Sequence, residues 1–463
     1  MLTAPPFVLD MARAFAARGG RALLVGGWVR DALLGVESKD VDLEVFGLPG
    51  DVVRDVVETF GPVNAVGESF TVYKVRDVDV ALPRRESKSG RGHRGFDVRG
   101  DPFMTFEEAA RRRDFTINAI GLDPLTAEVL DPCGGRDDLD RRLLRVVSAE
   151  TFGDDSLRVL RALQFAARFR LRVDPATVAL CRATPLDDLP AERVWGEMDK
   201  LLRRAVRPSV GLALARDLDV LPRLFPELQA LVGCPQEPEW HPEGDVWVHT
   251  LMVVDRARER LDGLSDPEQV ALMVGALAHD LGKPATTAVI DGRIRSPNHE
   301  AEGVAPALAL LDRFRLHTLD GYDVRRQVAG LVAYHLAPGM WHKARTPVGD
   351  GAFRRLAGRV DLELLARLSE ADCLGRAGRF DCSASAWFRE RARSLGVEHR
   401  PPAALLLGRH VLALGLPPGP AVGRILSAVY ERQLDGQVHS LDEAIGLARE
   451  LIAAGATPTD DRR

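Results

Sequence analysis

The sequence predicts an α+β protein in which an α/β head is followed by helices to the end of the chain. Three observations support this prediction. The apolar run Leu23–Val25 and the alternating acidic and apolar residues 40–46 are typical of strands, because strand side chains point alternately to two faces. From Leu139 onward, apolar residues recur at helical spacing almost everywhere. The 463 residues, 46% of them hydrophobic, are enough for about three domains.

The head is organised around residues 23–47. Gly26 and Gly27 follow the first strand and predict a tight turn, after which residues 29–34 predict a short helix that Gly35 ends. The backbone N–H groups at such a turn and helix start are suited to binding a triphosphate.

The strand that follows carries a pair of acids. Asp40 and Asp42 are two positions apart, so their carboxylates lie on one face and repel each other. A divalent cation would neutralise this pair, and metal sites of this kind serve phosphoryl and nucleotidyl transfer. Taken alone, the alternation is more typical of a solvated strand face. Arg30, three residues after Gly27, favours the interpretation as a metal and nucleotide site.

Together these residues resemble the first motif of the class II tRNA nucleotidyltransferases and bacterial poly(A) polymerases of the polymerase-β superfamily. The matching residues are Gly26, Gly27, Val29, Arg30, Asp31, Leu34, Gly35, Asp40 and Asp42. The resemblance implies a polymerase-β-like head in which Asp40 and Asp42 are catalytic and hold Mg²⁺. It also implies that Gly27 and Arg30 bind the nucleotide.

The sequence of the rest of the head predicts further helices and strands. Residues 1–20 and 51–60 predict helices, and residues 70–82 predict two strands with a charged turn between them. Asp79 lies on one of these strands and is a candidate third acid beside the pair.

A basic, glycine-containing stretch at residues 83–103 predicts a mobile loop beside the site. The net charge of the chain is −5, which argues weakly against a nucleic-acid binder. The loop nevertheless concentrates positive charge that suits a phosphate strand, in Arg84, Arg85, Lys88, Arg91, Arg94 and Arg99, with His93. The alternative is a surface linker. The family resemblance implies a loop here that helps the enzyme to switch nucleotides.

Residues 111–119, RRRDFTINA, resemble the second motif of the family, which implies that Arg113 contacts the nucleotide. Guanidinium groups suit triphosphate oxygens, although adjacent arginines are more often a solvated helix face. Residues 131–135, DPCGG, resemble the element that closes the head and leads into a helical neck.

Residues 154–161 predict a helix on which Asp154, Arg158 and Arg161 lie near one face, with Asp155 beside them. An ordinary ion pair within the helix is one interpretation. The segment also resembles the family motif whose aspartate and arginine read the edge of the incoming base. The resemblance assigns this role to Asp155 and Arg158, with Arg161 as a further nucleotide contact. Asp154 replaces the leading glutamate of the motif, and the nearby Glu192-Arg193 pair is predicted to be structural.

A second set of chemical residues begins with His249 on a predicted helix. His279-Asp280 follows an apolar run, and Asp372 comes later in the chain. Single histidines of this kind are usually core residues, but the ordered set resembles the HD phosphohydrolase superfamily. The resemblance implies a divalent transition metal, Ni²⁺, Mn²⁺ or Co²⁺, at these four residues. His299 and His335 are either additional ligands, for phosphate or a second metal, or surface histidines.

The remaining features exclude several protein classes. No apolar run reaches the ~20 residues that span a bilayer and no signal peptide is recognisable, so we expect a cytoplasmic protein without a membrane partner. The five cysteines show no C-x-x-C pair and are expected to be thiols, with neither a disulfide framework nor a cysteine-bound zinc. The helical tail shows no chemistry of its own.

The resemblance implies an enzyme that adds C, C and A from CTP and ATP to the tRNA 3′ end, with a domain that hydrolyses phosphate esters. The expected domains are a head (1–138), a neck and body (139–238), an HD domain (239–378) and a tail (379–463). An A-adding enzyme or a poly(A) polymerase is an alternative within the family. The alternative of another class is a metal phosphohydrolase whose head only binds nucleotides.

Overall fold

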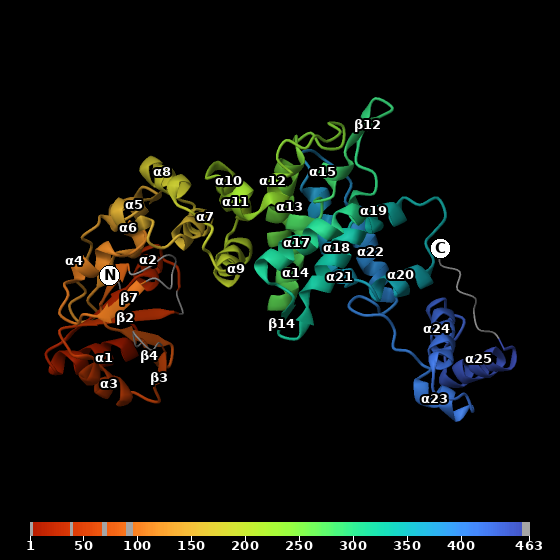
Figure 1. The fold of residues 1–463 in the computed structure, drawn as a ribbon, viewed down its shortest axis with the longest axis horizontal. Helices are drawn as coiled ribbons and strands as arrows, with labels where there is room; N and C mark the ends of the chain where they lie inside the picture. Colours follow the sequence, from red (N-terminus) through yellow and green to blue (C-terminus); the bar gives the residue numbers. More distant parts are fainter. Residues whose placement is uncertain (1–2, 38–39, 67–71, 89–95, 456–463) are drawn as a thin grey trace. The chain divides into compact units, whose positions relative to one another are not determined.

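The computed structural model describes residues 3–37, 40–66, 72–88 and 96–455 of the chain. These residues form two compact units, of which the first ends at Phe225 and the second begins at Pro226. Figure 1 shows that the larger sheet belongs to the first unit, whereas the second unit is built mainly of helices. The predicted fold class, an α/β head followed by helices, is confirmed.

A seven-stranded mixed sheet forms the centre of the first unit, with the strand order β3-β4-β5-β2-β1-β8-β9. Strand β2 (Val41–Phe46) pairs antiparallel with β1 (Arg21–Val25) and parallel with β5 (Val78–Ala81). The other strands are β3 (Asn64–Val66), β4 (Val72–Val75), β8 (Gly121–Leu122) and β9 (Val129–Leu130). The four strands predicted in this region correspond to β1, β2, β4 and β5.

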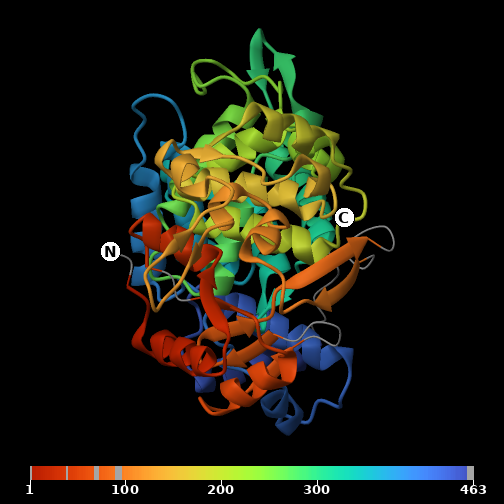
Figure 2. The ribbon, with the colours of Figure 1, turned by 90° about the vertical axis from the view of Figure 1, so that its left-hand side faces the viewer.

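The basic stretch predicted as a loop contains two strands, β6 (Arg84–Lys88) and β7 (Phe96–Gly100), which pair antiparallel. Figure 2 shows these strands side by side, in orange. The prediction of a loop is therefore wrong for both segments. The prediction of a loop depended on the four glycines of this stretch. Three of them lie within residues 89–95, which are outside the described residues. An ion pair of 2.6 Å between Arg85 and Asp101 ties the hairpin to the segment that follows it.

Helices complete the first unit. Helix α1 (Pro6–Ala17) packs against β1 and against α3 (Gly50–Glu58), and both helices were predicted. Helix α7 (Leu157–Phe169) is long and mostly buried, and packs against α9 and α10. The remaining helices are α2 (Gly27–Leu33), α4 (Phe106–Arg111), η1 (Thr116–Asn118), α5 (Gly135–Asp140), α6 (Ala149–Phe152), α8 (Pro175–Ala183), α9 (Ala191–Asp199), η2 (Lys200–Arg204), α10 (Pro208–Asp217) and α11 (Val220–Leu224).

Four helices form the core of the second unit: α13 (Val246–Arg258), α14 (Asp266–Ala278), α18 (Val324–Tyr334) and α21 (Leu362–Leu374). Helix α14 is buried from Val270 to Ala278, so it is surrounded by the others rather than amphipathic. Around this core lie α12 (Pro226–Gln229), α15 (Lys283–Thr286), α16 (His299–Glu302), α17 (Val304–Phe314), α19 (Ala337–His342), α20 (Asp350–Ala357) and α22 (Ser383–Ser394).

Short strand pairs also occur after Leu139, where none was predicted. They are β10 (Leu143–Leu144) with β11 (Arg172–Val173), β12 (Ala288–Ile290) with β13 (Arg293–Arg295), and β14 (Thr318–Leu319) with β15 (Tyr322–Asp323). The last two pairs are hairpins closed by Asp291-Gly292 and Asp320-Gly321, all four residues with positive φ. Asp-Gly is a strong signal for such two-residue turns, so these hairpins were readable from the sequence.

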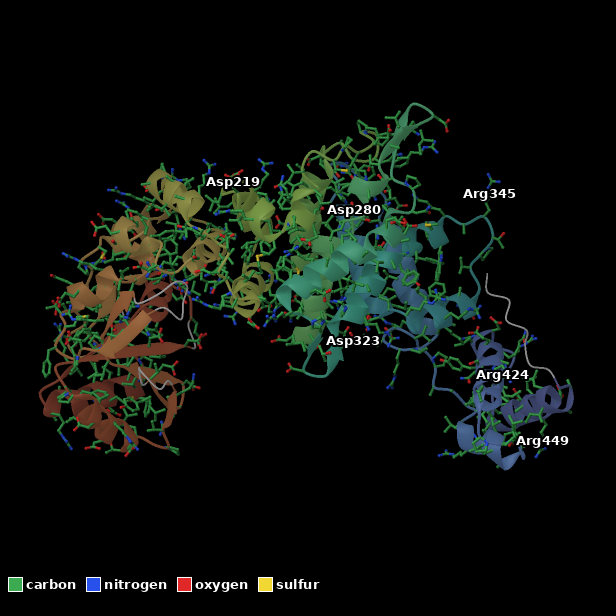
Figure 3. All side chains as sticks on the ribbon, in the orientation of Figure 1. Asp219, Asp280, Asp323, Arg345, Arg424 and Arg449 are labelled. Carbon is green, nitrogen blue, oxygen red and sulfur yellow. A yellow bond between two sulfur atoms is a disulfide. The ribbon has the colours of Figure 1, made fainter. Side chains whose placement is uncertain are left out.

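The C-terminal helices α23 (Gly408–Ala413), α24 (Pro420–Leu434) and α25 (Leu441–Ala453) share a small apolar core of their own. Figure 3 labels Arg424 and Arg449 on two of them. An ion pair of 2.8 Å between Arg355 and Asp435 joins these helices to α20.

Two of the five cysteines, all of which were expected to be thiols, are joined in a disulfide. Cys373 and Cys382 form a disulfide with a Cα–Cα distance of 5.7 Å, whereas Cys133, Cys181 and Cys234 are free thiols. The disulfide joins the end of α21 to the N-cap of α22. The sequence did not reveal it because the nine-residue separation becomes a short distance only when the intervening loop folds back. In the described part of the chain, no helix is long and apolar enough to cross a bilayer.

Candidate functional sites

The acids predicted to hold Mg²⁺ lie at the start of β2, where both side chains are exposed. Partial desolvation by the surrounding protein atoms raises the pKa of Asp42. Arg113 opposes this shift, whereas the carboxylates of Asp79, Asp40 and Glu44 add to it. The surroundings of Asp42 therefore disfavour the ionised form of its carboxyl. Crowded, accessible carboxylates of this kind fit a divalent cation, because its charge removes their repulsion.

Asp79, the candidate third acid, lies opposite Asp42 in the parallel register of β2 with β5. Its Oδ1 atom is 3.2 Å from the Nζ atom of Lys74 on the neighbouring strand. The fold thus brings a third carboxylate to the pair and gives it a cationic neighbour.

The glycine turn lies directly beside these acids. Gly26 has a positive φ of 67°, and a Cβ atom there would lie 3.1 Å from Nη1 of Arg113 and 3.6 Å from Oδ2 of Asp42. A side chain at this position would crowd the site, so glycine is required for both conformation and space. Gly27 begins α2, which places the predicted phosphate-binding turn next to the acids.

Arg113 lies beside the acid pair and is held in place by a buried carboxylate. Its Nη2 atom is 3.3 Å from Oε2 of Glu44, while Nη2 of Arg112 donates to Oε1 of the same residue at 2.6 Å. The Glu44 side chain is 4% exposed and those of both arginines are 20% exposed. Glu44 therefore orients the two guanidinium groups while leaving them partly open.

Arg30, the predicted nucleotide-binding residue after the glycine turn, has protein partners in this structure. It is buried, its guanidinium pairs with Asp31 at 2.7 Å, and it donates to Oδ1 of Asn118 at 2.6 Å. The same group stacks over the ring of Phe169 at 4.2 Å. In this structure Arg30 joins α2 to α7, and contact with a triphosphate would require it to exchange these partners.

Arg161 continues the same polar network. Its Nε atom donates to Oδ2 of Asp114 at 2.6 Å, and Asn118 donates to Oδ1 of Asp114 at 3.0 Å. Burial opposes ionisation of Asp114, but Arg161 and the hydrogen bonds outweigh it and lower the pKa of this carboxyl. Asp114 therefore stays charged and fixes the second motif to the helix that carries Arg161.

The predicted helix at residues 154–161 begins later than expected, because Asp154 and Asp155 lie in the turn before α7. Asp155 Oδ1 accepts a hydrogen bond of 3.2 Å from the backbone N–H of Leu157, a capping interaction that competes with helix formation. The shared helical face inferred from the spacing is therefore wrong for both aspartates.

The two residues predicted to read the base have separate partners in this structure. Arg193 donates to both oxygens of Asp155, at 3.1 and 2.8 Å. Arg158 donates to the backbone oxygens of Thr151 and Arg112, at 2.7 and 2.8 Å. Arg193 thus has the structural role expected of it, and it holds a predicted base-reading residue.

The second candidate site lies among the helices of the second unit, where Figure 3 labels Asp280. His249 Nε2 lies 3.1 Å from Oδ1 of Asp372 and 3.9 Å from Oδ2 of Asp280. His279 Nε2 lies 3.2 Å from Oδ2 of Asp280. Three elements supply these residues, namely α13, the end of α14 and α21. The fold therefore brings together all four residues of the predicted set.

The donor atoms of this set suit a transition metal. The ligand atoms of His249, His279 and Asp280 all lie within 4.8 Å of one another. Nε2 of His279 is buried, and its 3.2 Å approach to Oδ2 of Asp280 does not have hydrogen-bond geometry. A buried imidazole nitrogen that faces carboxylate oxygens in this way fits a cation between them.

His299 and His335 extend the site on the other side of Asp280. Their Nε2 atoms lie 3.4 and 3.9 Å from Oδ1 of Asp280, and they are 8% and 1% exposed, so the surface alternative is wrong. Burial lowers the pKa of His335 to about 4, which keeps it in the neutral form. Gly282 permits this approach, because a Cβ atom there would lie 2.0 Å from the backbone oxygen of His299.

Lys283 belongs to the same site, although no role was predicted for it. Its Nζ atom lies 2.8 Å from Oδ2 of Asp280 and donates to Oε1 of Gln236 at 2.7 Å. Burial opposes ionisation of Asp280, but His279 and Lys283 outweigh it and hold the pKa of Asp280 well below its usual range. The signal that could have found Lys283 is its spacing of three residues from Asp280, which places the two side chains together.

A cavity of about 330 Å³ opens onto these residues. Asp280, His299 and Asp372 line it, and so do the basic residues Lys343 and Arg376. Basic side chains beside metal-binding groups suit an anionic substrate of modest size.

Comparison with known proteins places both sites within described families. Residues 22–145 match the Poly A polymerase head domain, residues 171–231 match the "probable RNA and SrmB- binding site of polymerase A", and residues 246–377 match the HD domain. The multifunctional CCA protein of Methylococcus capsulatus is 38% identical over 427 residues, which cover 88% of this chain and 92% of that protein. A multifunctional CCA protein of Xanthomonas campestris is 38% identical over 424 residues, covering 88% and 96%.

A solved structure extends the similarity to the fold. The Bacillus stearothermophilus CCA-adding enzyme in complex with CTP superposes with a TM-score of 0.65 at 23% identity. The alignment covers 98% of this chain and 99% of that one.

Proposed function

Since this chain belongs to the family of multifunctional CCA proteins, we propose that it adds C, C and A from CTP and ATP to the 3′ end of tRNA without a nucleic-acid template. The observation that carries the proposal is the accessible acid pair at the start of β2, with Asp42 close to the Gly26 turn and that turn close to Arg113. This arrangement joins a cation site to groups that bind phosphate.

Asp40 and Asp42 would hold Mg²⁺, which when bound favours attack of the tRNA 3′-hydroxyl on the α-phosphate. The backbone N–H groups at Gly27 and the guanidinium of Arg113 would bind the triphosphate oxygens, because both present donors beside the acids. Arg30 and Arg161 remain proposed nucleotide contacts. Their present hydrogen bonds to Asn118 and Asp114 support a second role, in which they hold the site in shape.

Asp155 and Arg158 would select the base by hydrogen bonds to its edge, since a carboxylate offers acceptors and a guanidinium offers donors. Asp155 is 30% exposed and is already oriented by Arg193. We propose the boundaries 1–138, 139–238, 239–378 and 379–463 for the head, neck and body, HD domain and tail.

Sequencing of the products tests this proposal. A tRNA that lacks CCA is incubated with CTP, with ATP and with both, and the added nucleotides are read. Addition of C and C with CTP alone, and of CCA with both, supports the proposal. Addition of A only to a tRNA that ends in CC indicates an A-adding enzyme, long A tails indicate a poly(A) polymerase, and no addition contradicts the proposal.

We also propose that the second unit hydrolyses phosphate esters, including 2′,3′-cyclic phosphates, which would allow the protein to clean damaged tRNA ends. His249, His279, Asp280 and Asp372 would hold a divalent metal, Ni²⁺, Mn²⁺ or Co²⁺, whose chemistry when bound is activation of water. His299 and His335 would bind either the substrate phosphate or a second metal. Lys283 keeps Asp280 ionised and would help to hold the anionic substrate.

Hydrolysis of a 2′,3′-cyclic nucleotide, assayed with Mg²⁺, Mn²⁺, Ni²⁺ and Co²⁺ in turn, tests this second activity. Metal-dependent hydrolysis supports it, and a purified protein inactive with all four metals contradicts it. If hydrolysis occurs without any nucleotide addition, the chain is a phosphohydrolase whose head only binds nucleotides.

A further inference from the structure

One histidine of the second site differs from the other three in the partner of its Nδ1 atom. In His279, His299 and His335, Nδ1 lies 2.8 Å from the backbone oxygen of the residue three positions earlier. A carbonyl oxygen only accepts hydrogen bonds, so in each case Nδ1 carries the proton and Nε2 faces the site.

His249 has a carboxylate in place of the carbonyl. Its Nδ1 atom lies 2.9 Å from Oε1 of Glu243, while its Nε2 atom lies 3.1 Å from Oδ1 of Asp372. Both carboxylates accept hydrogen bonds, so a cation at the Asp372 side would leave Glu243 as the acceptor for the ring proton. Glu243 lies in the loop before α13, six residues ahead of His249. It was not recognised from the sequence because nothing in its spacing distinguishes it from other loop carboxylates.

Glu243 is itself firmly held. Its side chain is 1% exposed, and Oε1 also lies 2.9 Å from Nδ1 of His241. Oε2 accepts a hydrogen bond of 3.0 Å from the backbone N–H of Ala377, in the loop that follows the helix of Asp372. A buried carboxylate is tolerated only with such partners, so three donors converge on one group.

We propose that Glu243 is a positioning residue for the metal centre, which holds the His249 ring through Nδ1 so that its Nε2 atom is directed at the cation. The proposal rests on the proposed metal-binding function of the second unit. A carboxylate behind a metal-binding imidazole fixes its tautomer and makes the ring a stronger ligand than a carbonyl would. Through Ala377, the same carboxylate also anchors the loop next to Asp372.

The variant Glu243→Gln tests the proposal, since glutamine keeps the size of the side chain and removes its charge. We expect its Kd for Mn²⁺ or Ni²⁺, measured by calorimetry on the full-length protein, to rise by about 10- to 100-fold. The matched control is Glu363→Gln, which removes another poorly exposed, ion-paired carboxylate, on α21 and bound to Arg367 and Arg389. We expect its metal affinity to be that of the parent.

A second measurement separates positioning from a general structural role. In histidine-labelled protein loaded with diamagnetic Zn²⁺, ¹⁵N spectra distinguish a ring that binds the metal through Nε2 from one that binds it through Nδ1. We expect His249, assigned by its loss in His249→Gln, to bind through Nε2 and to carry its proton on Nδ1 in the parent, and to show an altered Nδ1 signal in Glu243→Gln. Binding of His249 through Nδ1 in the parent overturns the proposal even if the variant fails to fold.

The metal titrations also distinguish failure of the inference from failure of the function on which it rests. If the parent binds metal and Glu243→Gln binds it equally well, the positioning role is wrong and the metal centre stands. If the parent binds no metal under any condition, the proposed hydrolase function fails, and the positioning role fails with it.

Discussion

Asp40 and Asp42 are exposed and lie two positions apart at the start of β2, whereas the buried residues His249 and His279-Asp280 come from α13 and from the end of α14. In the first unit the partly open guanidinium of Arg113 stands beside the acids. In the second unit the donor atoms face one another across a few ångströms around Asp280.

The difference in exposure fits the size of the substrate proposed for each site. An exposed acid pair can receive a nucleotide and the end of a large RNA. The nearby arginines donate hydrogen bonds to Glu44 and Asp114, which hold them in place before any substrate arrives. Asp280 and Asp372 of the buried cluster line a cavity of about 330 Å³, which suits a small phosphate ester. Substitutions should therefore affect the two sites separately.

The largest expected effect follows Asp42→Ala. Removing one carboxylate of the pair should lower the rate of nucleotide addition by more than about a hundredfold, because it removes half of the protein charge that holds the cation. tRNA affinity, measured by filter binding, should change by less than about twofold, since phosphate contacts depend on basic side chains. Asp51→Ala, an exposed acid of α3, is the control. Addition above about a hundredth of the parent rate would remove Asp42 from the site.

His279→Ala should act only on the second unit. Loss of one imidazole from about four protein ligands should weaken metal binding at least about tenfold, which metal analysis after dialysis will detect. The control is His317→Ala, whose side chain is 56% exposed. Retention of parental metal content by His279→Ala would show that the cluster is structural.

Asp155→Ala should reduce selectivity more than rate. Loss of a base-edge acceptor worth about 1–3 kcal/mol should reduce the preference for CTP and ATP over UTP and GTP by roughly tenfold. Competition between labelled nucleotides measures this, with Glu150→Ala, an exposed acid of α6, as the control. An unchanged preference would contradict the role of Asp155 in reading the base.

The smallest expected effect is on stability. A transition metal at about 100 times its Kd should stabilise the folded second unit by about 2.7 kcal/mol, which corresponds to roughly 5–10 °C in its Tm. Calorimetry should show this shift in one transition, while the transition of the first unit moves less. Equal shifts of both transitions would mean that the metal is not specific to the second unit.

The two sites also differed in how far the sequence revealed them. The first motif and the acid pair lie within residues 23–47, so strand periodicity and turn chemistry were enough to predict them. The ligands of the second unit extend from residue 249 to 372, and only the family resemblance joined them. Both sets are brought together by the fold as expected.

The sequence could not show which side chains contact each other, because these contacts depend on how the elements pack. Arg30 matches its motif, yet it is buried against Phe169 because α2 and α7 meet there. Asp155 belongs to the turn before α7, where local capping prevails over the helical spacing that was inferred. Glu243 gives no sequence signal, since its contact with His249 depends on how the preceding loop folds.

The most direct test of two separate centres measures both activities on Asp42→Ala and on His279→Ala, with the parent beside them. We predict that Asp42→Ala loses CCA addition and keeps hydrolysis of a 2′,3′-cyclic nucleotide, and that His279→Ala does the reverse. Loss of both activities in either folded variant would contradict the account, because it would show that the two sites depend on each other.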